Sequence, residues 1–334
     1  MNMQSKKKRI YFAPMEGVTG YVYRNLHHEM FPGADRYYTP FLSANHTHSF
    51  KSKEGRDIDP ANNRVPELIP QILTNSPEDF LWAVKRLSSA GYRQIDLNLG
   101  CPSSTVTAKK KGAGFLACPD ALDAFFDQVF HGLETAPETA GDPVRISVKT
   151  RLGVNDVSES AGLMKIFNRY PFCELVIHAR VRDDLYKGSP RLDAFEQCFE
   201  DSVHPVCYNG DIFSREDYVK ITERFPGLSA VMLGRGLVSD PALIGDIRNG
   251  ENRSGSVSFS VPEERRLKLM DFHDRLFEDY CAAMAPKDAV FHLKEVWYYM
   301  SRSFEGYEKE IRNMLKAKKP DDYIAAAARL KSAL

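Results

Sequence analysis

Short apolar runs recur along most of the chain, and stretches of helical composition separate them. The eight runs lie at residues 10–13, 35–41, 68–73, 94–99, 144–150, 174–178, 205–208 and 230–233. The helical stretches lie at 19–30, 76–89, 119–132 and 157–169, and a further helix start lies at 214–217. Apolar runs of this length that end at turn residues are typical of buried strands. The pattern therefore predicts strands that alternate with helices.

The run at 94–99 has a clear two-residue period. Its leucine and isoleucine residues face one side of the predicted strand, whereas Asp96 and Asn98 face the other. Gly100 and Pro102 end the extended run, so Cys101 lies where a strand turns into a loop. A single cysteine is more often a small buried hydrophobe than a reactive thiol. Cys101 taken alone is therefore open to both interpretations.

The alternation of strands and helices predicts the fold class. Each connection is long enough for a crossover, which favours parallel pairing, and eight parallel strands can close a barrel. We expect a (β/α)₈ TIM barrel over residues 1–248, with an open doubly wound sheet as the alternative. A Gly/Ser-rich linker is expected at 249–261. Residues 262–334 have helical composition only, with breaks near Pro286, Gly306 and Pro320, and predict a small domain of three or four helices.

Composition narrows the class of protein. The chain has 334 residues, of which 43% are hydrophobic and 27% charged, and no apolar run approaches the ~18 residues of a membrane span. Its six cysteines form no C-x-x-C pair, which argues against disulfides and a structural metal. We expect a cytoplasmic protein. The zero net charge argues against indiscriminate binding of nucleic acid but leaves room for a local basic face.

Polar or conformationally special residues follow most of the predicted strands. In a barrel of this kind the active site lies at the carboxyl ends of the strands. The residues concerned are Pro14, Met15, Gln71, Asn98, Cys101, Lys149, Arg151, His178, Arg180, Asn209, Gly210, Asp211, Gly234 and Arg235. A purely structural barrel needs no such pattern, although a lone histidine or lysine among them is often structural.

The last two strand ends resemble a phosphate site in chemical terms. Gly210 and Gly234 allow backbone N–H groups to approach an anion, and Arg235 adds a charged donor. Lys149 and His178 then suit the polar edge of a ring carried by that phosphate. Flavin mononucleotide (FMN) has a phosphate and a pyrimidine edge of this kind.

The motifs at the strand ends resemble those of the tRNA-dihydrouridine synthases, flavoenzymes that reduce a uridine in tRNA. The matching stretches are Ala13-Pro14-Met15-Glu16-Gly17-Val18-Thr19, Asp96-Leu97-Asn98-Leu99-Gly100-Cys101-Pro102-Ser103, Lys149-Thr150-Arg151, His178-Ala179-Arg180, Asn209-Gly210-Asp211-Ile212 and Gly234-Arg235-Gly236. They occur in the family's order, and the helical tail is similar in place and size to the family's RNA-binding domain. The first of them is similar to one bacterial branch.

The resemblance implies roles for individual residues. Cys101 would be the general acid that protonates C5 of the uracil, with NADPH as the reductant of the flavin. The implied FMN ligands are Pro14, Met15, Gln71, Lys149, His178, Asn209, Gly210, Asp211, Gly234 and Arg235. Asn98 and Arg180 would lie near the target base, and Tyr186, Lys294 and Arg302 are candidates for contact with tRNA. Trp297 and Tyr298 are better explained as core residues.

Three places in the chain depart from the family pattern. Val181, Tyr208 and the stretch Ser239-Asp240-Pro241-Ala242 replace the residues usual there, which affects the packing expected near the phosphate.

Two alternative functions stay open beside a dihydrouridine synthase. One alternative is another FMN-dependent TIM-barrel oxidoreductase that acts on a small molecule, and a second is a catalytically silent tRNA-binding protein. A monomer is expected, and the sequence does not identify the target uridine.

Overall fold

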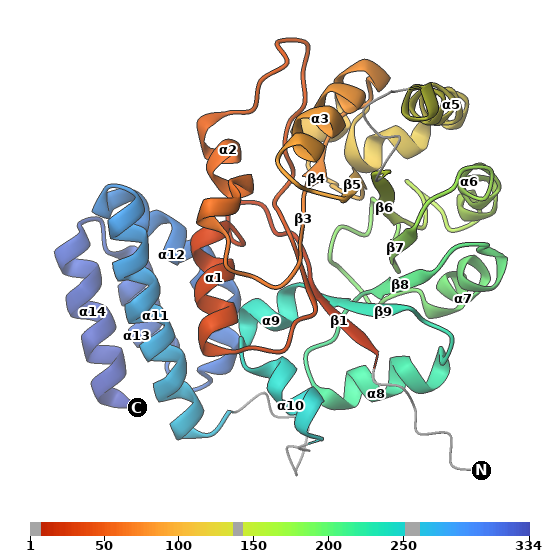
Figure 1. The fold of residues 1–334 in the computed structure, drawn as a ribbon. Helices are drawn as coiled ribbons and strands as arrows, with labels where there is room; N and C mark the ends of the chain where they lie inside the picture. The colour runs from red at the N-terminus through yellow and green to blue at the C-terminus, as the bar shows by residue number, and fades with distance from the viewer. Residues whose placement is uncertain (1–7, 136–142, 251–260) are drawn as a thin grey trace. The chain divides into compact units, whose positions relative to one another are not determined.

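The fold was analysed in a computed structural model of the protein, which describes residues 8–135, 143–250 and 261–334 (Figure 1). The chain divides into two compact units. The first comprises Met1–Pro14, Asp35–Asp211 and Ile221–Leu233, and the second comprises Met15–Ala34, Ile212–Lys220 and Gly234–Leu334. In the described parts of the chain, no helix combines the length and the apolar character that crossing a membrane requires.

The first unit contains a parallel sheet that closes on itself. Its strands are β1 (Arg9–Phe12), β2 (Arg36–Tyr38), β3 (Leu68–Ile69), β4 (Gln71–Ile72), β5 (Gln94–Leu99), β6 (Arg145–Arg151), β7 (Glu174–His178), β8 (Val206–Asn209) and β9 (Ala230–Leu233). Strand β1 pairs with both β2 and β9, and each further strand pairs in chain order. The predicted TIM barrel is confirmed, and the open doubly wound sheet is excluded.

Strands β3 and β4 correspond to the one strand predicted at 68–73. Pro70 separates them, because proline has no N–H to donate to a sheet ladder. Its carbonyl still accepts from the backbone N–H of Asp96 at 2.9 Å. The segment therefore pairs with β2 before the proline and with β5 after it, which joins the two ends of the sheet.

Helices of the first unit lie outside its strands (Figure 1). They are α2 (Ser52–Ile58), α3 (Pro77–Ser89), α4 (Ser104–Thr107), α5 (Pro119–Thr135), α6 (Glu159–Phe167) and α7 (Leu192–Asp201), with 3-10 turns η1 (Pro60–Asn62) and η2 (Gly112–Ala117). Helix α3 begins as predicted, since the Ser76 hydroxyl accepts from the N–H of Asp79 at 3.2 Å. The sequence analysis missed α7, whose N-cap residue Arg191 makes no side-chain capping bond.

The second unit is helical. It contains α1 (Tyr21–Met30), α9 (Arg235–Ser239), α10 (Leu243–Asn249), α11 (Glu263–Ala283), α12 (Pro286–Met300), η4 (Ser301–Ser303), α13 (Glu308–Lys316) and α14 (Pro320–Ala333), and α8 (Arg215–Arg224) spans the division between the units. Two of the predicted breaks, Pro286 and Pro320, are the first residues of helices. The predicted domain boundaries at 248 and 262 stay a prediction, and residues 251–260 of the predicted linker lie outside the described residues.

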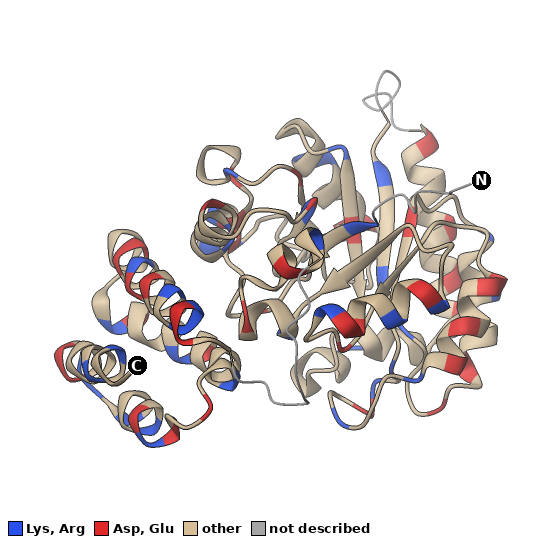
Figure 2. Ribbon diagram, turned by 90° about the horizontal axis from the view of Figure 1, so that it is seen from below, with Lys and Arg blue, Asp and Glu red and all other residues tan. Residues whose placement is uncertain are grey.

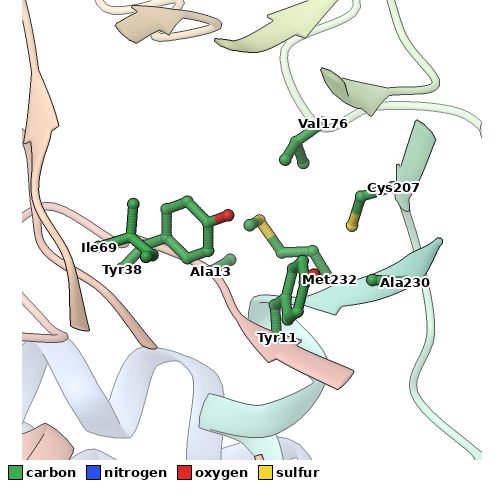
Figure 3. Close-up of a cluster of buried hydrophobic side chains, with 8 residues drawn as sticks. All are labelled: Tyr11, Ala13, Tyr38, Ile69, Val176, Cys207, Ala230 and Met232. Carbon is green, nitrogen blue, oxygen red and sulfur yellow. The ribbon is translucent and has the colours of Figure 1, made fainter. Parts of the chain in front are cut away.

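The barrel is filled by side chains that point inward from its strands. Figure 3 shows this core, formed by Tyr11, Ala13, Tyr38, Ile69, Val176, Cys207, Ala230 and Met232. A buried polar network lies next to this core, at the amino-terminal ends of the strands. Glu174 accepts from the hydroxyls of Tyr11 and Ser229 at 3.2 and 2.7 Å and lies 3.4 Å from the guanidinium of Arg36. The opposite, carboxyl ends of the strands carry the candidate site residues.

Candidate active site

A chain of buried hydrogen bonds runs across β4 and β5 toward Cys101. The Gln71 side chain donates through Nε2 to Oδ2 of Asp96 at 2.7 Å and accepts through Oε1 from Nδ2 of Asn98 at 2.7 Å. Asn98 accepts through Oδ1 from the backbone N–H groups of Gly100 and Cys101, at 3.1 and 2.9 Å. These last two bonds turn the backbone out of the strand and place Cys101 at the start of the loop.

The loop that carries Cys101 is also held from its other side. The backbone N–H of Ala113 donates to the Cys101 carbonyl at 3.0 Å. Gly112 has φ +55°, and a Cβ there would lie 2.8 Å from that carbonyl oxygen, so only glycine fits this close approach. The Cys101 side chain is half-buried. A fixed thiol at the mouth of the barrel is suited to proton transfer.

Arg151 connects this loop with the loop that follows β7. Its guanidinium donates to the carbonyl of Gly100 at 2.8 Å and to those of Val181 and Leu185 at 2.9 and 3.0 Å. The guanidinium also lies 5.6 Å from the ring centre of Tyr186. Arg151 was predicted as a strand-end residue, but no role could be predicted for it. Its partners come from distant parts of the chain.

The ends of β7 and β8 are joined by a buried ion pair. Arg180 is fully buried and donates to Oδ2 of Asp211 at 2.6 Å and to the Gly188 carbonyl at 2.6 Å. Its Nη1 lies 3.4 Å from Nε2 of His178. The His178 ring is 6.1 Å from that of Tyr186, which is 51% exposed. The structure thus brings four predicted site residues together at one mouth of the barrel.

Lys149 is a cation without a bonded partner. In the described part of the chain its ammonium group makes no hydrogen bond and no ion pair, and its backbone pairs with that of Asn98 across β5 and β6. Burial, followed by the charge of Arg151, lowers the pKa of Lys149 to about 8, and Asp96 and Cys101 act in the opposite direction. Burial raises the pKa of Asp96 to about 7 despite hydrogen bonds from Gln71 and Ser147.

The end of β8 depends on a close approach that only glycine allows. A Cβ on Gly210 would lie 2.2 Å from the hydroxyl oxygen of Tyr208, whose ring packs edge-on against Phe195 with 5.0 Å between ring centres. Tyr208 therefore fills space beneath Gly210. The neighbouring Asn209 donates to the carbonyl of Met232 at 2.9 Å, which ties β8 to β9.

Other predicted site residues belong to the second unit. The backbone N–H of Met15 donates to the Thr19 hydroxyl at 2.8 Å. Gly234 directly precedes α9, and the guanidinium of Arg235 lies 5.8 Å from the ring centre of Phe213. The Arg302 guanidinium lies 4.3 Å from the centre of the same ring.

The tail residues divide between core and surface. Trp297 is fully buried and Tyr298 is 74% exposed, so the interpretation of both as core residues is correct for Trp297 and wrong for Tyr298. Lys294 donates to the carbonyl of Ala317, within the helical part of the chain. Whether Lys294 and Arg302 contact tRNA stays a prediction.

The residues of the first unit fit a flavin. A desolvated lysine without an ion-pair partner suits an electron-rich ring, and Gln71 retains one N–H and one lone pair beyond its bonds to Asp96 and Asn98. The sequence analysis gave no role to Asp96, although the two-residue period placed it on the same side as Asn98. A carboxylate inside a strand is itself a signal, since buried carboxylates require partners.

Comparisons with known proteins agree with this chemistry. The family model described as Dihydrouridine synthase matches residues 11–331. A relative from Staphylococcus aureus, named "Probable tRNA-dihydrouridine synthase", is 30% identical over 331 residues, which cover 93% of this chain and 88% of the relative. A relative from Neisseria meningitidis serogroup B, named "tRNA-dihydrouridine(16) synthase", is 31% identical over 261 residues, which cover 75% and 74% of the two chains.

The fold also resembles that of a solved structure. Histamine dehydrogenase from Rhizobium sp. 4-9 matches 82% of this chain and 48% of its own, with a TM-score of 0.55 and 14% sequence identity. At this identity the likeness supports the barrel fold alone.

Proposed function

The chain belongs to the dihydrouridine synthase family, and we propose that it reduces the C5=C6 bond of one uridine in tRNA with FMN as hydride carrier, NADPH as reductant and Cys101 as proton donor. The observation that carries the proposal is the hydrogen-bond chain that ends on the backbone of Cys101, with Lys149 beside it. It places a fixed thiol and an unpaired cation at the mouth of one barrel.

The proposed reaction adds two hydrogens across one double bond. When bound, FMN would supply hydride to C6 of the uracil, and NADPH would restore its reduced form. Cys101 would donate its Sγ proton to C5, and its thiolate would then regain a proton from water. The charges of Lys149 and Cys101 interact, so a protonated Lys149 stabilises the thiolate that remains after proton transfer.

The ligands proposed for the flavin are those that the family motifs imply. The residues that would hold it are Pro14, Met15, Gln71, Lys149, His178, Asn209, Gly210, Asp211, Gly234 and Arg235. Gln71 has donor and acceptor capacity for the ring, and Gly234 and Arg235 have N–H groups for the phosphate. Arg235 lies at the Phe213 ring with a second guanidinium, that of Arg302, which adds positive charge at that place.

A uracil must leave the base stack of the tRNA before it can react in a barrel. Asn98 has one N–H left for a substrate carbonyl, and Tyr186 has an exposed ring on which a base can stack. Lys294 and Arg302 are proposed as further tRNA contacts. Figure 2 shows Lys and Arg mixed with Asp and Glu over the helices, and the net charge is zero, so we expect tRNA binding to depend on local groups of cations.

The test of the function is direct. Purified protein loaded with FMN is incubated with NADPH and with tRNA from cells that lack dihydrouridine, and the nucleosides are then analysed by mass spectrometry. We expect a gain of two hydrogens at one uridine. Reduction of free uracil or orotate but not of tRNA would favour the small-molecule alternative, and protein that takes up no flavin would favour the silent tRNA-binding alternative.

Replacement of Tyr186 by alanine is expected to raise the KM for tRNA, because a stacking platform for a base is lost. Stacking of a base on an aromatic ring contributes ~1–3 kcal/mol, which corresponds to an increase of roughly 5- to 150-fold. The Tyr186→Phe variant keeps the ring and should behave as the parent does. Steady-state kinetics with unmodified tRNA measure both, and an unchanged KM in Tyr186→Ala would contradict the stacking role.

A further inference from the structure

The hydrogen-bond chain from Asp96 to Cys101 has a fixed direction. Its last members, two backbone N–H groups, can only donate, and its first member, the Asp96 carboxylate, can only accept when it is ionised. Gln71 must therefore present Nε2 to Asp96 and Oε1 to Asn98, and the observed bonds of 2.7 Å have this arrangement. If the Gln71 amide were flipped, its oxygen would face the Asp96 oxygen and its nitrogen would face the Asn98 nitrogen. Neither hydrogen bond could then form.

The direction of the chain decides what each amide can offer to a bound molecule. Asn98 uses its oxygen for Gly100 and Cys101 and one N–H for Gln71, so its second N–H is the polar group left over. Asn98 can thus donate a hydrogen bond to a ring carbonyl. It cannot bond to a ring amino group, because both groups would be donors. Gln71 keeps one donor and one acceptor.

Asp96 itself has no exposed surface. It is fully buried, and its Oδ1 accepts from the hydroxyl of Ser147 at 2.8 Å while its Oδ2 accepts from Gln71. Register explains this placement, since Gln71 and Ser147 are the direct neighbours of Asp96 on β4 and β6. Asp96 can therefore act through the side chains that it orients and through its charge.

We infer that Asp96 is a positioning residue for the proposed reaction: it fixes the direction of the Gln71 and Asn98 amides and is the counter-charge of Lys149. This inference rests on the proposed function of the site. The ionisable groups that face Asp96 are Lys149 on β6, Glu174 and Cys173 at the start of β7, and Tyr38 on β2. Lys149 is the one of opposite charge, and a charged Asp96 favours its protonated form.

Two substitutions separate the two effects. Asp96→Ala removes the acceptor for Nε2 of Gln71, so the amide is held only by the hydrogen bond from Asn98 to its Oε1. Asp96→Asn keeps an acceptor oxygen for Gln71 but removes the charge that supports Lys149. The matched control is Glu174→Gln, which alters another buried carboxylate of the same sheet at the strand starts, among Tyr11, Arg36 and Ser229.

The first measurement needs no tRNA. The FMN dissociation constant and the absorption spectrum of the bound flavin are recorded for each folded variant. Asp96→Ala is expected to weaken FMN binding at least about tenfold and to shift the spectrum, because Gln71 loses its orientation. Asp96→Asn and Glu174→Gln are expected to bind FMN as the parent does. This readout is independent of whether tRNA is the substrate, so a failure of the proposed function would be recognised separately.

The second measurement is the pH profile of flavin reduction by NADPH. The basic limb should follow Lys149, whose pKa is about 8, and loss of the Asp96 charge should move this limb to lower pH in Asp96→Asn. Glu174→Gln should leave the limb in place. The inference is overturned if the limb of Asp96→Asn coincides with that of the parent, or if Glu174→Gln reproduces the changes seen in the Asp96 variants. Should Asp96→Ala fail to fold, the Asp96→Asn profile decides alone.

Discussion

Replacement of Cys101 by alanine is expected to lower turnover by roughly 10²- to 10⁴-fold, the usual contribution of a positioned general acid. FMN and tRNA should bind as before, because the Cys101 backbone keeps its hydrogen bonds to Asn98 and Ala113. The loop should therefore stay in place while the proton donor is lost. Single-turnover reduction of unmodified tRNA by prereduced enzyme measures the chemical step, and filter binding measures the affinity for tRNA.

Two further variants make this result specific. Cys118→Ala removes another half-buried cysteine, on the far side of η2, and should have parental turnover. Cys101→Ser keeps a hydroxyl, which is a weaker acid than a thiol, and should lie between the parent and the alanine variant. Parental rates in Cys101→Ala would exclude the acid role and leave the hydrogen-bonded loop without a catalytic purpose.

Replacement of Lys149 by methionine is expected to lower the rate of flavin reduction by roughly 10²- to 10³-fold, the range found when one electrostatic donor is removed from an active site. Methionine is of similar length but uncharged, so the change removes the desolvated ammonium and little packing. The Asp96 carboxylate loses its counter-charge in this variant but keeps its hydrogen bonds from Gln71 and Ser147, so the fold should be retained. FMN fluorescence and stopped-flow reduction by NADPH measure the loss.

The pH dependence distinguishes Lys149 from a structural lysine. Burial lowers the pKa of Lys149, so the ammonium loses its proton as the pH rises through about 8, and the parental rate should fall over that range. Lys149→Met should have a low rate without this limb. Lys165→Met, a change of an exposed lysine on α6, should keep both the rate and the limb. A parental limb that persists in Lys149→Met would assign the titration to another group.

Much of the fold could be predicted because it depends on local signals. The apolar runs identified the strands, and the capping residue Ser76 marked the start of α3. Two features of the fold were not predicted from the sequence, and each has a physical reason. Pro70 divides one predicted strand because it cannot donate to the ladder, and α7 has no capping side chain at Arg191 that would have marked its beginning.

The candidate site was predicted less completely. The position of Cys101 after a strand was evident, since glycine and proline end the run there. Asp96, by contrast, had no assigned role, because its partners Gln71 and Ser147 are 25 and 51 residues away and are brought to it by strand register. Arg180 and Asp211 were assigned to different ligands, whereas the structure joins them in one ion pair.

The sequence by itself determined the alternating elements, the polar residues at the strand ends and the motifs of the family, because each of these is a property of consecutive residues. The tertiary structure alone decided which strand-end residues touch, because register across parallel strands is not encoded in the alternation within any one strand. It also decided the direction in which the pKa values of Asp96 and Lys149 shift, since desolvation depends on what surrounds a group in space. The sequence therefore placed Cys101 at the site, and the fold gave it a fixed backbone and a neighbouring cation.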